Sequence, residues 1–403
     1  MKKKNIYFIN KKIYIIFIII FLILILIYHN HNKKCIISSF SKFIKTFNLN
    51  LNHVEQNKKI MTMGKKILYI SRHQGTMANF DYIAKHLGFN ITTLKPDYGY
   101  RDKPKCFDKD KCLSFVKEKC SEFDFIIISD IIPDSYVYIT NKCNKKIILE
   151  ITNRFDAFVK DQTYYKIFAQ AVKKKNVIVA ENNPFEVYHA CEKNSFIPNY
   201  YLIRPVGYPP NNIFKKEHGE YHDIVGTIFN PYYQTSRLLE EKLNKINLPY
   251  KRLPHKYGGP LVLATYKAII MLPYQVSVMK MMENIRYGVP MIIPSEKLMR
   301  KLIKGKYSFA AKQLFNIPNG VRKYIEFYND EFRDLFIYFD NFNDLPNIIE
   351  NTDFIAIREK EKKFMKYYEQ KILKMWAEVL DISYIKESKI SDKKPLCNNK
   401  IFF

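Results

Sequence analysis

The stretch that decides the fold covers residues 267–295 and reads KAIIMLPYQVSVMKMMENIRYGVPMIIPS. Its apolar beginning is typical of a buried strand, and this strand is expected to end at Pro273. A turn over 274–277 follows, and the amphipathic segment after it predicts a helix over 276–287. Gly288 can end that helix in the left-handed conformation, and Pro290 stands at the entry to a second apolar run. Strand, turn, helix and strand in this order form the repeating unit of a parallel α/β sheet.

The turn at 274–277 has the features of an anion-binding site. The first backbone N–H groups of a helix have no partner inside the helix and attract anions, and here they lie near Gln275, Val276 and Ser277. The Ser277 hydroxyl can cap the helix or donate a hydrogen bond to a phosphate. Glu283 follows about two turns after Gln275 on the same side. A carboxylate there can accept hydrogen bonds from both ribose hydroxyls, so the stretch predicts a nucleotide site.

A basic loop precedes this stretch, since residues 251–260 read KRLPHKYGGP. Arg252 and Lys256 are its candidates for contact with a bound anion. Gly258, followed by a second glycine, would let the backbone approach a nucleotide closely. A solvated basic loop is the alternative explanation of these cations.

Helices are expected over 77–87, 164–172, 234–246 and 359–380 and from Pro184 onward. Between them, apolar runs continue on both sides of residues 267–295. These runs lie at 67–71, 91–94, 125–129, 146–151, 176–180, 201–206, 223–229, 250–253, 268–272, 289–293 and 336–339. Because the central runs are apolar throughout, we expect parallel strands that are covered on both faces. A Pro-Pro-Asn-Asn linker at 209–212 divides the runs into two groups.

This division predicts an α/β fold with two doubly wound, Rossmann-like domains and a cleft between them. The first domain covers 65–208, the second covers 209–355, and a C-terminal helix within 356–382 packs back on the first domain. Residues 383–403 form a polar tail. Trp376, the only tryptophan, is expected in the core. Ligands of such sheets bind outside the carboxyl ends of the strands.

Polar residues follow three strands of the first domain. His73 comes after the first strand, where it can act as a base or contact a sugar or phosphate. Asp130 ends the FIIIS strand and is expected at the same cleft. Arg154 and Asp156 end the next strand and are further cleft candidates. A structural loop histidine is the alternative explanation of His73.

Residues 267–295 resemble the donor site of GT-B glycosyltransferases, in particular the retaining types with an E-x7-E motif. Glu283 matches the second acid, which holds the nucleotide ribose in that family, and residues 284–290 match its small-residue ending. The first acid falls on Gln275, so this chain reads Q-x7-E. The resemblance implies a metal-independent glycosyltransferase that needs no cofactor. It also implies that Arg252 and Lys256 neutralise the leaving diphosphate. Its partners would be a nucleotide sugar and a glycan, glycoprotein or lipid acceptor.

Three alternatives remain open on the sequence alone. Asp108 and Asp110 form a D-x-D pattern, which a metal-dependent transferase of the GT-A type would use. A nucleotide-sugar epimerase or hydrolase would keep the fold and change the reaction. A non-catalytic, membrane-tethered protein that binds nucleotide sugars is the third.

Residues 13–28 form an unbroken apolar run, which as a helix would cover roughly 24 Å. Five lysines precede the run, so the positive-inside rule predicts a cytoplasmic tail over 1–12 and a signal anchor over 13–28. Residues 29–64 read as a stem. A cleaved signal peptide is the alternative, but no small-residue cleavage site follows the run. The chain is therefore expected to be a type II membrane protein of the endoplasmic reticulum or Golgi with a lumenal catalytic part.

The formal net charge of +27 comes from lysines that are spread along the whole chain. Such a distribution indicates a solvated surface and argues against a specific nucleic-acid partner. The seven cysteines matter more. In an oxidising lumen Cys106, Cys112, Cys120 and Cys143 can pair, with Cys106–Cys112 as a short-loop candidate. Cys35 in the stem could bridge a homodimer.

Overall fold

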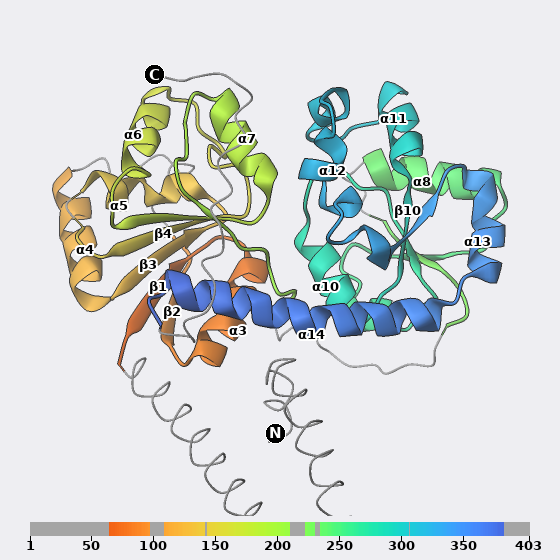
Figure 1. The fold of residues 1–403 in the computed structure, drawn as a ribbon, viewed down its shortest axis with the longest axis horizontal. Coiled ribbons are helices and arrows are strands. Elements are labelled where there is room, and N and C mark those ends of the chain that lie inside the picture. Colours follow the sequence, from red (N-terminus) through yellow and green to blue (C-terminus); the bar gives the residue numbers. More distant parts are fainter. Residues whose placement is uncertain are drawn as a thin grey trace, which may run out of the picture. The chain divides into compact units, whose positions relative to one another are not determined.

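The computed structural model describes residues 64–96, 109–141, 143–209, 222–229, 234–305 and 307–382 (Figure 1). The predicted cytoplasmic tail, membrane anchor and polar tail, and the predicted stem up to residue 63, lie outside these ranges. Among the helices inside them, none combines the length and the hydropathy that a membrane crossing needs.

The first lobe, residues 64–209, contains a sheet of six parallel strands in the order β2-β1-β3-β4-β5-β6. The strands are β1 Lys66–Ile70, β2 Asn90–Leu94, β3 Phe125–Ser129, β4 Lys146–Ile151, β5 Val177–Glu181 and β6 Tyr201–Leu202. The helices are α3 Gln74–Leu87, α4 Lys109–Glu122, α5 Tyr136–Thr140, α6 Thr163–Ala171 and α7 Pro184–Glu192.

The second lobe, from residue 222 onward, contains five parallel strands in the order β11-β10-β9-β7-β8. The strands are β7 Gly226–Ile228, β8 Lys251–Leu253, β9 Ile269–Ile270, β10 Met291–Pro294 and β11 Phe336–Phe339. The helices are α8 Gln234–Lys245, α9 Pro260–Leu263, α10 Met279–Tyr287, α11 Glu296–Lys304, α12 Gly320–Tyr324 and α13 Leu345–Asn351. The prediction of two parallel α/β sheets is confirmed.

Both sheets share one topological feature that positions ligands. In each, the chain first adds a strand on one side of the opening strand and then crosses to its other side. The strand order therefore reverses between β1 and β3 in the first lobe and between β7 and β9 in the second. Loops diverge at such a point and leave a crevice beyond the carboxyl ends of the strands. The fold thus provides one crevice per sheet.

Two helices near the crevices begin elsewhere than the sequence predicts. Helix α10 begins at Met279, three residues after the predicted start, because Val278 is still extended, with φ −142° and ψ 136°. Helix α3 begins at Gln74, earlier than the predicted start at 77, because the side chain of His73 caps it. Helices α4, α5, α9 and α11 to α13 were not predicted.

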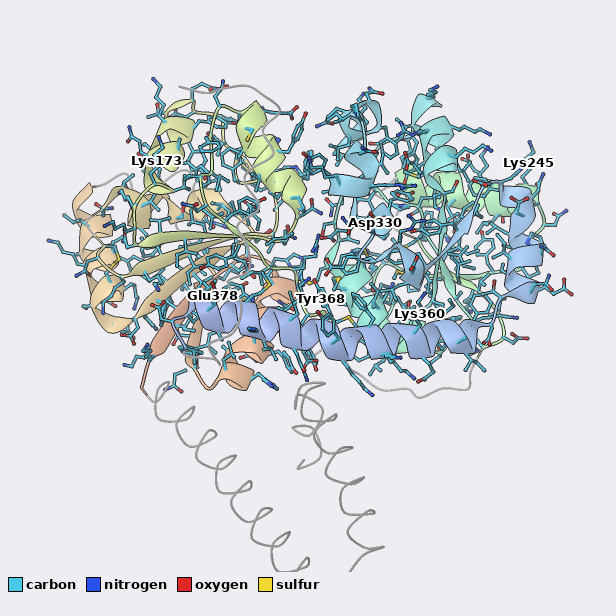
Figure 2. All side chains as sticks on the ribbon, in the orientation of Figure 1. Lys173, Lys245, Asp330, Lys360, Tyr368 and Glu378 are labelled. Atoms are coloured by element: carbon cyan, nitrogen blue, oxygen red, sulfur yellow. A yellow bond between two sulfur atoms is a disulfide. The ribbon has the colours of Figure 1, made fainter. Side chains whose placement is uncertain are left out.

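The long C-terminal helix α14, Phe354–Val379, packs on α10 of the second lobe and on α3 of the first (Figure 1). Figure 2 labels Lys360, Tyr368 and Glu378 in turn along it. Trp376 is 1% exposed, and its ring meets the Phe80 ring edge-on at 4.9 Å. Helix α14 therefore contacts both lobes, and its tryptophan lies in the core.

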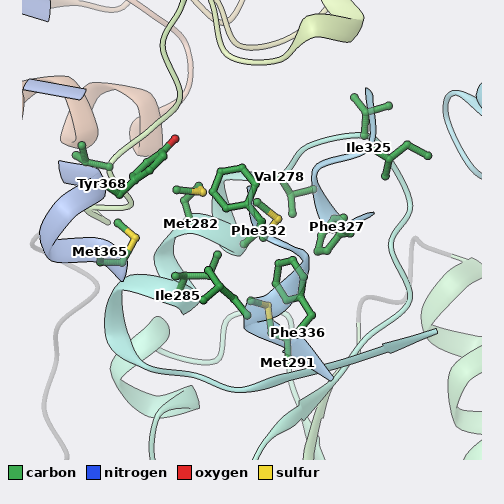
Figure 3. Packing of buried hydrophobic residues seen from close by; sticks show 14 of the residues in the cluster. Val278, Met282, Ile285, Met291, Ile325, Phe327, Phe332, Phe336, Met365 and Tyr368 are labelled. Atoms are coloured by element: carbon green, nitrogen blue, oxygen red, sulfur yellow. The ribbon is translucent and has the colours of Figure 1, made fainter. Parts of the chain in front are cut away.

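The core of the second lobe is continuous with α14. Figure 3 shows Met282 and Ile285 of α10 between the side chains of Met365 and Tyr368 and the ring of Phe332. The rings of Phe332 and Tyr368 lie 5.7 Å apart in an edge-on contact. Burying aromatic rings of this size contributes several kcal/mol, so this contact holds the segment around Phe332 firmly beside the C-terminal helix.

The segment that joins the lobes, residues 203–208, is held from both sides. Oδ1 of Asn79 in α3 accepts hydrogen bonds from the backbone N–H groups of Val206 at 2.9 Å and Gly207 at 3.2 Å. Gly207 has φ 79°, and a Cβ at this position would lie 2.4 Å from the backbone oxygen of Met282 in α10. Only glycine allows so close an approach at this φ.

The disulfide Cys120–Cys143 joins the end of α4 to the segment before β4. Both of its cysteines are among the four expected to pair. They are the two that do not belong to the short-loop candidate Cys106–Cys112. Cys106 and the side chain of Cys112 lie outside the described residues. Closing a loop of this kind stabilises the fold mainly by restricting the unfolded chain.

Candidate functional site

Two cavities lie at the carboxyl ends of the two sheets. The first-lobe cavity has a volume of about 330 Å³ and the second-lobe cavity about 350 Å³. The first-lobe cavity is lined by His73, Thr76, Asp130, Thr152, Asn153, Arg154, Asn182, Glu186, Pro205, Gln275, Val276, Ser277, Val278 and Met279. The second-lobe cavity is lined by His73, Ile228, Thr235, Ser236, Leu239, His255, Ile269, Ile270, Met271, Leu272, Tyr274, Gln275, Val278, Met279, Lys280 and Glu283.

The two cavities share four lining residues, which we call the junction: His73, Gln275, Val278 and Met279. The first turns of α3 and α10 meet here. A Cβ added at Gly75 of α3 would lie 3.6 Å from Cγ of Met279, the first residue of α10. Each helix directs its N-terminal end, with its unpaired N–H groups, toward this region. The junction therefore favours negative charge.

The second-lobe cavity combines apolar walls with one acid and one cation. Ile228 and Ile270, from strands β7 and β9, contribute apolar surface. Glu283 and Lys280 lie three residues apart on α10, so their side chains share one face of the helix. Burial raises the pKa of Glu283 to about 7, although Lys280 opposes the shift. Burial also lowers the pKa of Lys280, opposed by Glu283.

The side chain of Lys280 lies over an aromatic ring. Its Nζ is 5.1 Å from the centroid of Tyr257, in the loop that follows β8. Such a cation–π contact orients the ammonium group and leaves its other donors available. Lys280 is therefore a fixed cation in the cavity wall.

The first-lobe cavity is more polar. Asp130 directly follows β3 and has φ 64°, a left-handed conformation that aspartate tolerates better than most residues. Its backbone N–H donates to Oγ1 of Thr152 at 3.2 Å, which holds the turn at the cavity wall. Backbone strain of this kind concentrates at functional sites.

An ion pair closes another side of the first-lobe cavity. Arg154, after β4, pairs with Glu186 in the first turn of α7, and the guanidinium lies 4.5 Å from the Phe185 ring centroid. Burial raises the pKa of Glu186 to about 8, against the opposing effect of Arg154. The cavity thus offers both a cation and a titratable carboxyl group to a polar ligand.

Seven of the eleven residues predicted from the sequence line these cavities. They are His73, Asp130, Arg154, Gln275, Val276, Ser277 and Glu283. The predicted cap by Ser277 is wrong. Val278 occupies the N-cap of α10 without a side-chain hydrogen bond.

Arg252, Lys256 and Gly258 line neither cavity. Arg252 pairs with Glu240 at 2.7 Å, and its guanidinium lies 3.7 Å from the Phe229 ring centroid. Gly258 has φ 93°, so glycine suits this turn for conformational reasons. A role of these three residues in donor binding stays a prediction.

Asp156 also lies outside both linings. Its carboxylate is bonded to Nε2 of His189 and to the hydroxyl of Tyr165, each at 2.8 Å. Its neighbour Arg154 lines the first-lobe cavity, as expected of a residue that follows a strand end.

Sequence reasoning missed Lys280, His255 and Glu186. Lys280 could have been found, because it lies one helical turn before Glu283. His255 stands between Arg252 and Lys256 in the basic loop. Of these three residues, only His255 lines the second-lobe cavity. Glu186 had no local signal, since its partner Arg154 is 32 residues away in the chain.

No three His, Cys, Asp or Glu side chains in the described ranges are grouped as a metal ion would require. Asp108 and the side chain of Asp110, the predicted D-x-D alternative, lie outside those ranges.

No protein-family model and no curated protein sequence matches the chain. Similar solved structures include HepE of Anabaena in complex with UDP and glucose, at 11% identity and a TM-score of 0.45, covering 79% of this chain and 99% of that one. The glycotransferase of kitacinnamycin is 8% identical with a TM-score of 0.42, and the match covers 78% of this chain and 98% of that one. A UDP-N-acetylglucosamine 2-epimerase described as putative, from Listeria monocytogenes, is 9% identical with a TM-score of 0.41. The match covers 81% of this chain and 100% of that one. The residues of the two cavities therefore carry the functional assignment.

Proposed function

We propose that this chain is a glycosyltransferase that moves a sugar from a nucleotide sugar to an acceptor hydroxyl, without a metal ion. In this proposal the nucleotide binds in the second-lobe cavity, the acceptor binds in the first-lobe cavity, and the two meet at the junction.

The composition of the second-lobe cavity supports its assignment to the nucleotide. Its apolar walls suit the flat face of a base, while a few polar groups orient the ligand. Glu283 supplies a carboxylate that can accept hydrogen bonds from the two ribose hydroxyls. Lys280 lies one helical turn nearer the start of α10, where it can face the diphosphate.

The first-lobe cavity supports an assignment to a hydroxyl-rich acceptor. Thr152, Asn153 and Asn182 provide neutral hydrogen-bonding groups, and Arg154 with Glu186 adds a charged pair. Asp130 is the carboxylate best placed to accept a proton from the acceptor hydroxyl as it attacks the sugar. The diphosphate leaves with the bonding electrons of the broken bond between the anomeric carbon and its oxygen.

One observation carries the proposal above the others. Each sheet has a cavity at its topological switch point, and the two cavities share the residues of the junction. Two substrates bound in this way would place a donor sugar and an acceptor hydroxyl next to each other. Proximity of that kind supplies a large part of the rate enhancement of group transfer.

The experiment that tests the proposal uses the full-length chain in detergent. A thermal-shift screen against UDP, GDP, ADP and CMP identifies the nucleotide, since a ligand that binds the folded state raises Tm. The matching nucleotide sugars are then incubated with and without acceptor glycans, and the products are analysed. Sugar transfer that requires the acceptor is the expected result.

Other outcomes of the same experiment identify the alternatives. Release of free sugar, or an isomerised nucleotide sugar, without any acceptor would indicate a hydrolase or an epimerase. Saturable nucleotide binding without turnover of any donor would indicate a binding protein. Loss of activity in EDTA, restored by manganese, would replace the metal-independent mechanism with one that uses Asp108 and Asp110.

We also propose that the chain is a type II membrane protein of the endoplasmic reticulum or Golgi with both lobes in the lumen. The apolar run at 13–28 and the lysines before it support this orientation. The Cys120–Cys143 disulfide suits an oxidising compartment. Both lobes should resist protease in sealed microsomes, and digestion without detergent would contradict this topology. A dimer that disappears in Cys35→Ser on non-reducing gels would support bridging through the stem.

A further inference from the structure

His73 is the only residue of the junction with a titratable side chain, and its ring is fixed by the backbone of α3. It occupies the N-cap of this 14-residue helix, and its Nδ1 accepts a hydrogen bond from the backbone N–H of Thr76 at 3.3 Å. The backbone N–H of His73 itself donates to Oγ of Ser71 at 3.1 Å. Residue and ring are therefore held from both sides.

This cap determines which nitrogen carries the proton. Nδ1 can accept the N–H of Thr76 only while it carries no hydrogen, since two N–H groups would otherwise face each other. A neutral imidazole with a bare Nδ1 carries its hydrogen on Nε2. The ring therefore offers a donor, not an acceptor, at Nε2.

The packing of Gly75 indicates where Nε2 points. A Cβ at Gly75 would lie 2.8 Å from Cε1 and 3.1 Å from Nδ1 of His73, so this edge of the ring faces the first turn of α3. Nε2 lies farther from this point than either of these atoms, and His73 lines both cavities. Nε2 has no hydrogen-bond partner among the residues that the structure describes.

We propose that His73 donates a hydrogen bond from Nε2 to a phosphate oxygen of a nucleoside diphosphate at the junction, and that it is not the base that activates the acceptor. The inference rests on the proposed function and specifies the role of one residue in it. The N-terminal ends of α3 and α10 meet at the same place and favour the same negative charge. Gly75 is a positioning residue, because any larger side chain would push the ring off its cap.

Two substitutions separate the donor role from the base role. His73→Gln keeps an N–H group near the position of Nε2 but loses the cap. His73→Asn keeps the cap, since asparagine is among the best N-cap residues, but its amide is too short to reach the phosphate. Isothermal titration with the tightest of UDP, GDP and ADP should show affinity within about fivefold of the parent for His73→Gln. It should show a loss of about 10- to 100-fold for His73→Asn, the usual range for a hydrogen bond to a charged group.

The corresponding nucleoside, which lacks phosphate, is the control ligand, and its affinity should be the same in parent and variants. Gly75→Ala should weaken diphosphate binding although His73 is still present. A lower Tm for His73→Gln than for His73→Asn would confirm the cap. Nitrogen-15 spectra of the imidazoles, assigned with His73→Asn, should show the hydrogen of His73 on Nε2.

Several results would overturn the inference. They are equal diphosphate affinities of His73→Gln and His73→Asn, unchanged affinity with an equal loss of turnover in both, and a hydrogen on Nδ1. If the parent binds diphosphate with the expected pattern of variants but transfers no sugar, the inference stands and the proposed reaction fails. If the parent binds no nucleoside diphosphate, both fail.

Discussion

The two cavities differ in chemistry although they arise from the same topology. In the second lobe, the ends of β7 and β9 contribute Ile228 and Ile270, and helix α10 adds the pair of Lys280 and Glu283. In the first lobe, the ends of β3 and β4 are followed by Asp130 and Thr152, and neutral or charged polar groups prevail. One fold element, the switch point of a parallel sheet, thus produces an apolar binding site in one lobe and a polar one in the other.

The topology of the sheet therefore determines where a crevice lies, and the residues after each strand determine which kind of ligand it can accept. An apolar wall with one carboxylate suits a nucleoside, and a polar wall suits a hydroxyl-rich acceptor. If the division is correct, substitutions in the two cavities should affect different measured quantities.

Asp130→Asn should have the largest effect. Asparagine tolerates the left-handed backbone that this position requires and removes only the proton acceptor. Turnover should fall by about 100- to 10,000-fold, the range for loss of a general base, with unchanged nucleotide affinity. Steady-state kinetics and nucleotide titration measure the two quantities. A loss of nucleotide affinity in this variant would contradict the assignment of the nucleotide and the acceptor to separate cavities.

Glu283→Gln should weaken nucleotide binding by about 10- to 100-fold, because the amide accepts hydrogen bonds less strongly than a carboxylate does. Glu241→Gln, at an exposed position of α8 outside both linings, is the matched control. Titration with the nucleotide found by thermal shift provides the measurement. Equal affinities of the two variants would contradict the assignment of Glu283 to the ribose.

The pH dependence of nucleotide binding tests whether Glu283 contacts the nucleotide as a charged carboxylate. Burial raises the pKa of Glu283 from 4.5 to about 7, so its carboxyl group becomes protonated as the pH falls below 7. Nucleotide affinity should then decrease by about tenfold per pH unit below 7 in the parent and stay flat in Glu283→Gln. A parent profile that is flat down to pH 5.5 would argue against a charged Glu283.

The raised pKa of Glu283 affects folding stability in the opposite direction from nucleotide affinity. A carboxyl group with a raised pKa binds a proton more tightly in the folded state, so its contribution to stability is fully present below pH 4.5. This contribution is lost as the pH rises toward 7. Glu283→Gln should therefore raise Tm at pH 7.5 more than at pH 5, and Glu241→Gln should not.

Arg252→Met and Lys256→Met should have the smallest effects on nucleotide affinity, less than about threefold, as expected of solvent-screened surface charges. Arg252 is 55% exposed and already pairs with Glu240, and neither cation lines a cavity. Lys280→Met is the matched variant inside the cavity and should weaken binding more. A larger loss in Arg252→Met would restore the basic loop as part of the donor site.

The first sheet was easier to predict than the second. Strands β3 and β4 have the bounds that their isoleucine-rich runs predict, because a strand buried on both faces must be apolar throughout. The run at 268–272 contains only two residues that pair as strand β9. Short strands of this kind depend on neighbours that are distant in the chain. The start of α3 was missed because histidine is an unusual N-cap residue.

The same distinction applies to the site. Gln275, Ser277 and Glu283 belong to one local unit of strand, turn and helix, and their spacing predicted a common site. Only Gln275 lines both cavities, whereas Ser277 lines that of the first lobe and Glu283 that of the second. The pairing of Arg154 with Glu186 depends on how β4 and α7 pack, and no local pattern encodes it. The cap that fixes the ring of His73 likewise follows from backbone geometry, which residue type alone does not specify.

Helix α14 has a consequence for how the protein is made. Phe80 belongs to α3 of the first lobe, yet its ring packs against Trp376, near the end of α14. During synthesis this part of the apolar surface of α3 stays uncovered until Trp376 has been translated. The first lobe, although the strands of its sheet end at residue 202, therefore completes its packing only when α14 has left the ribosome.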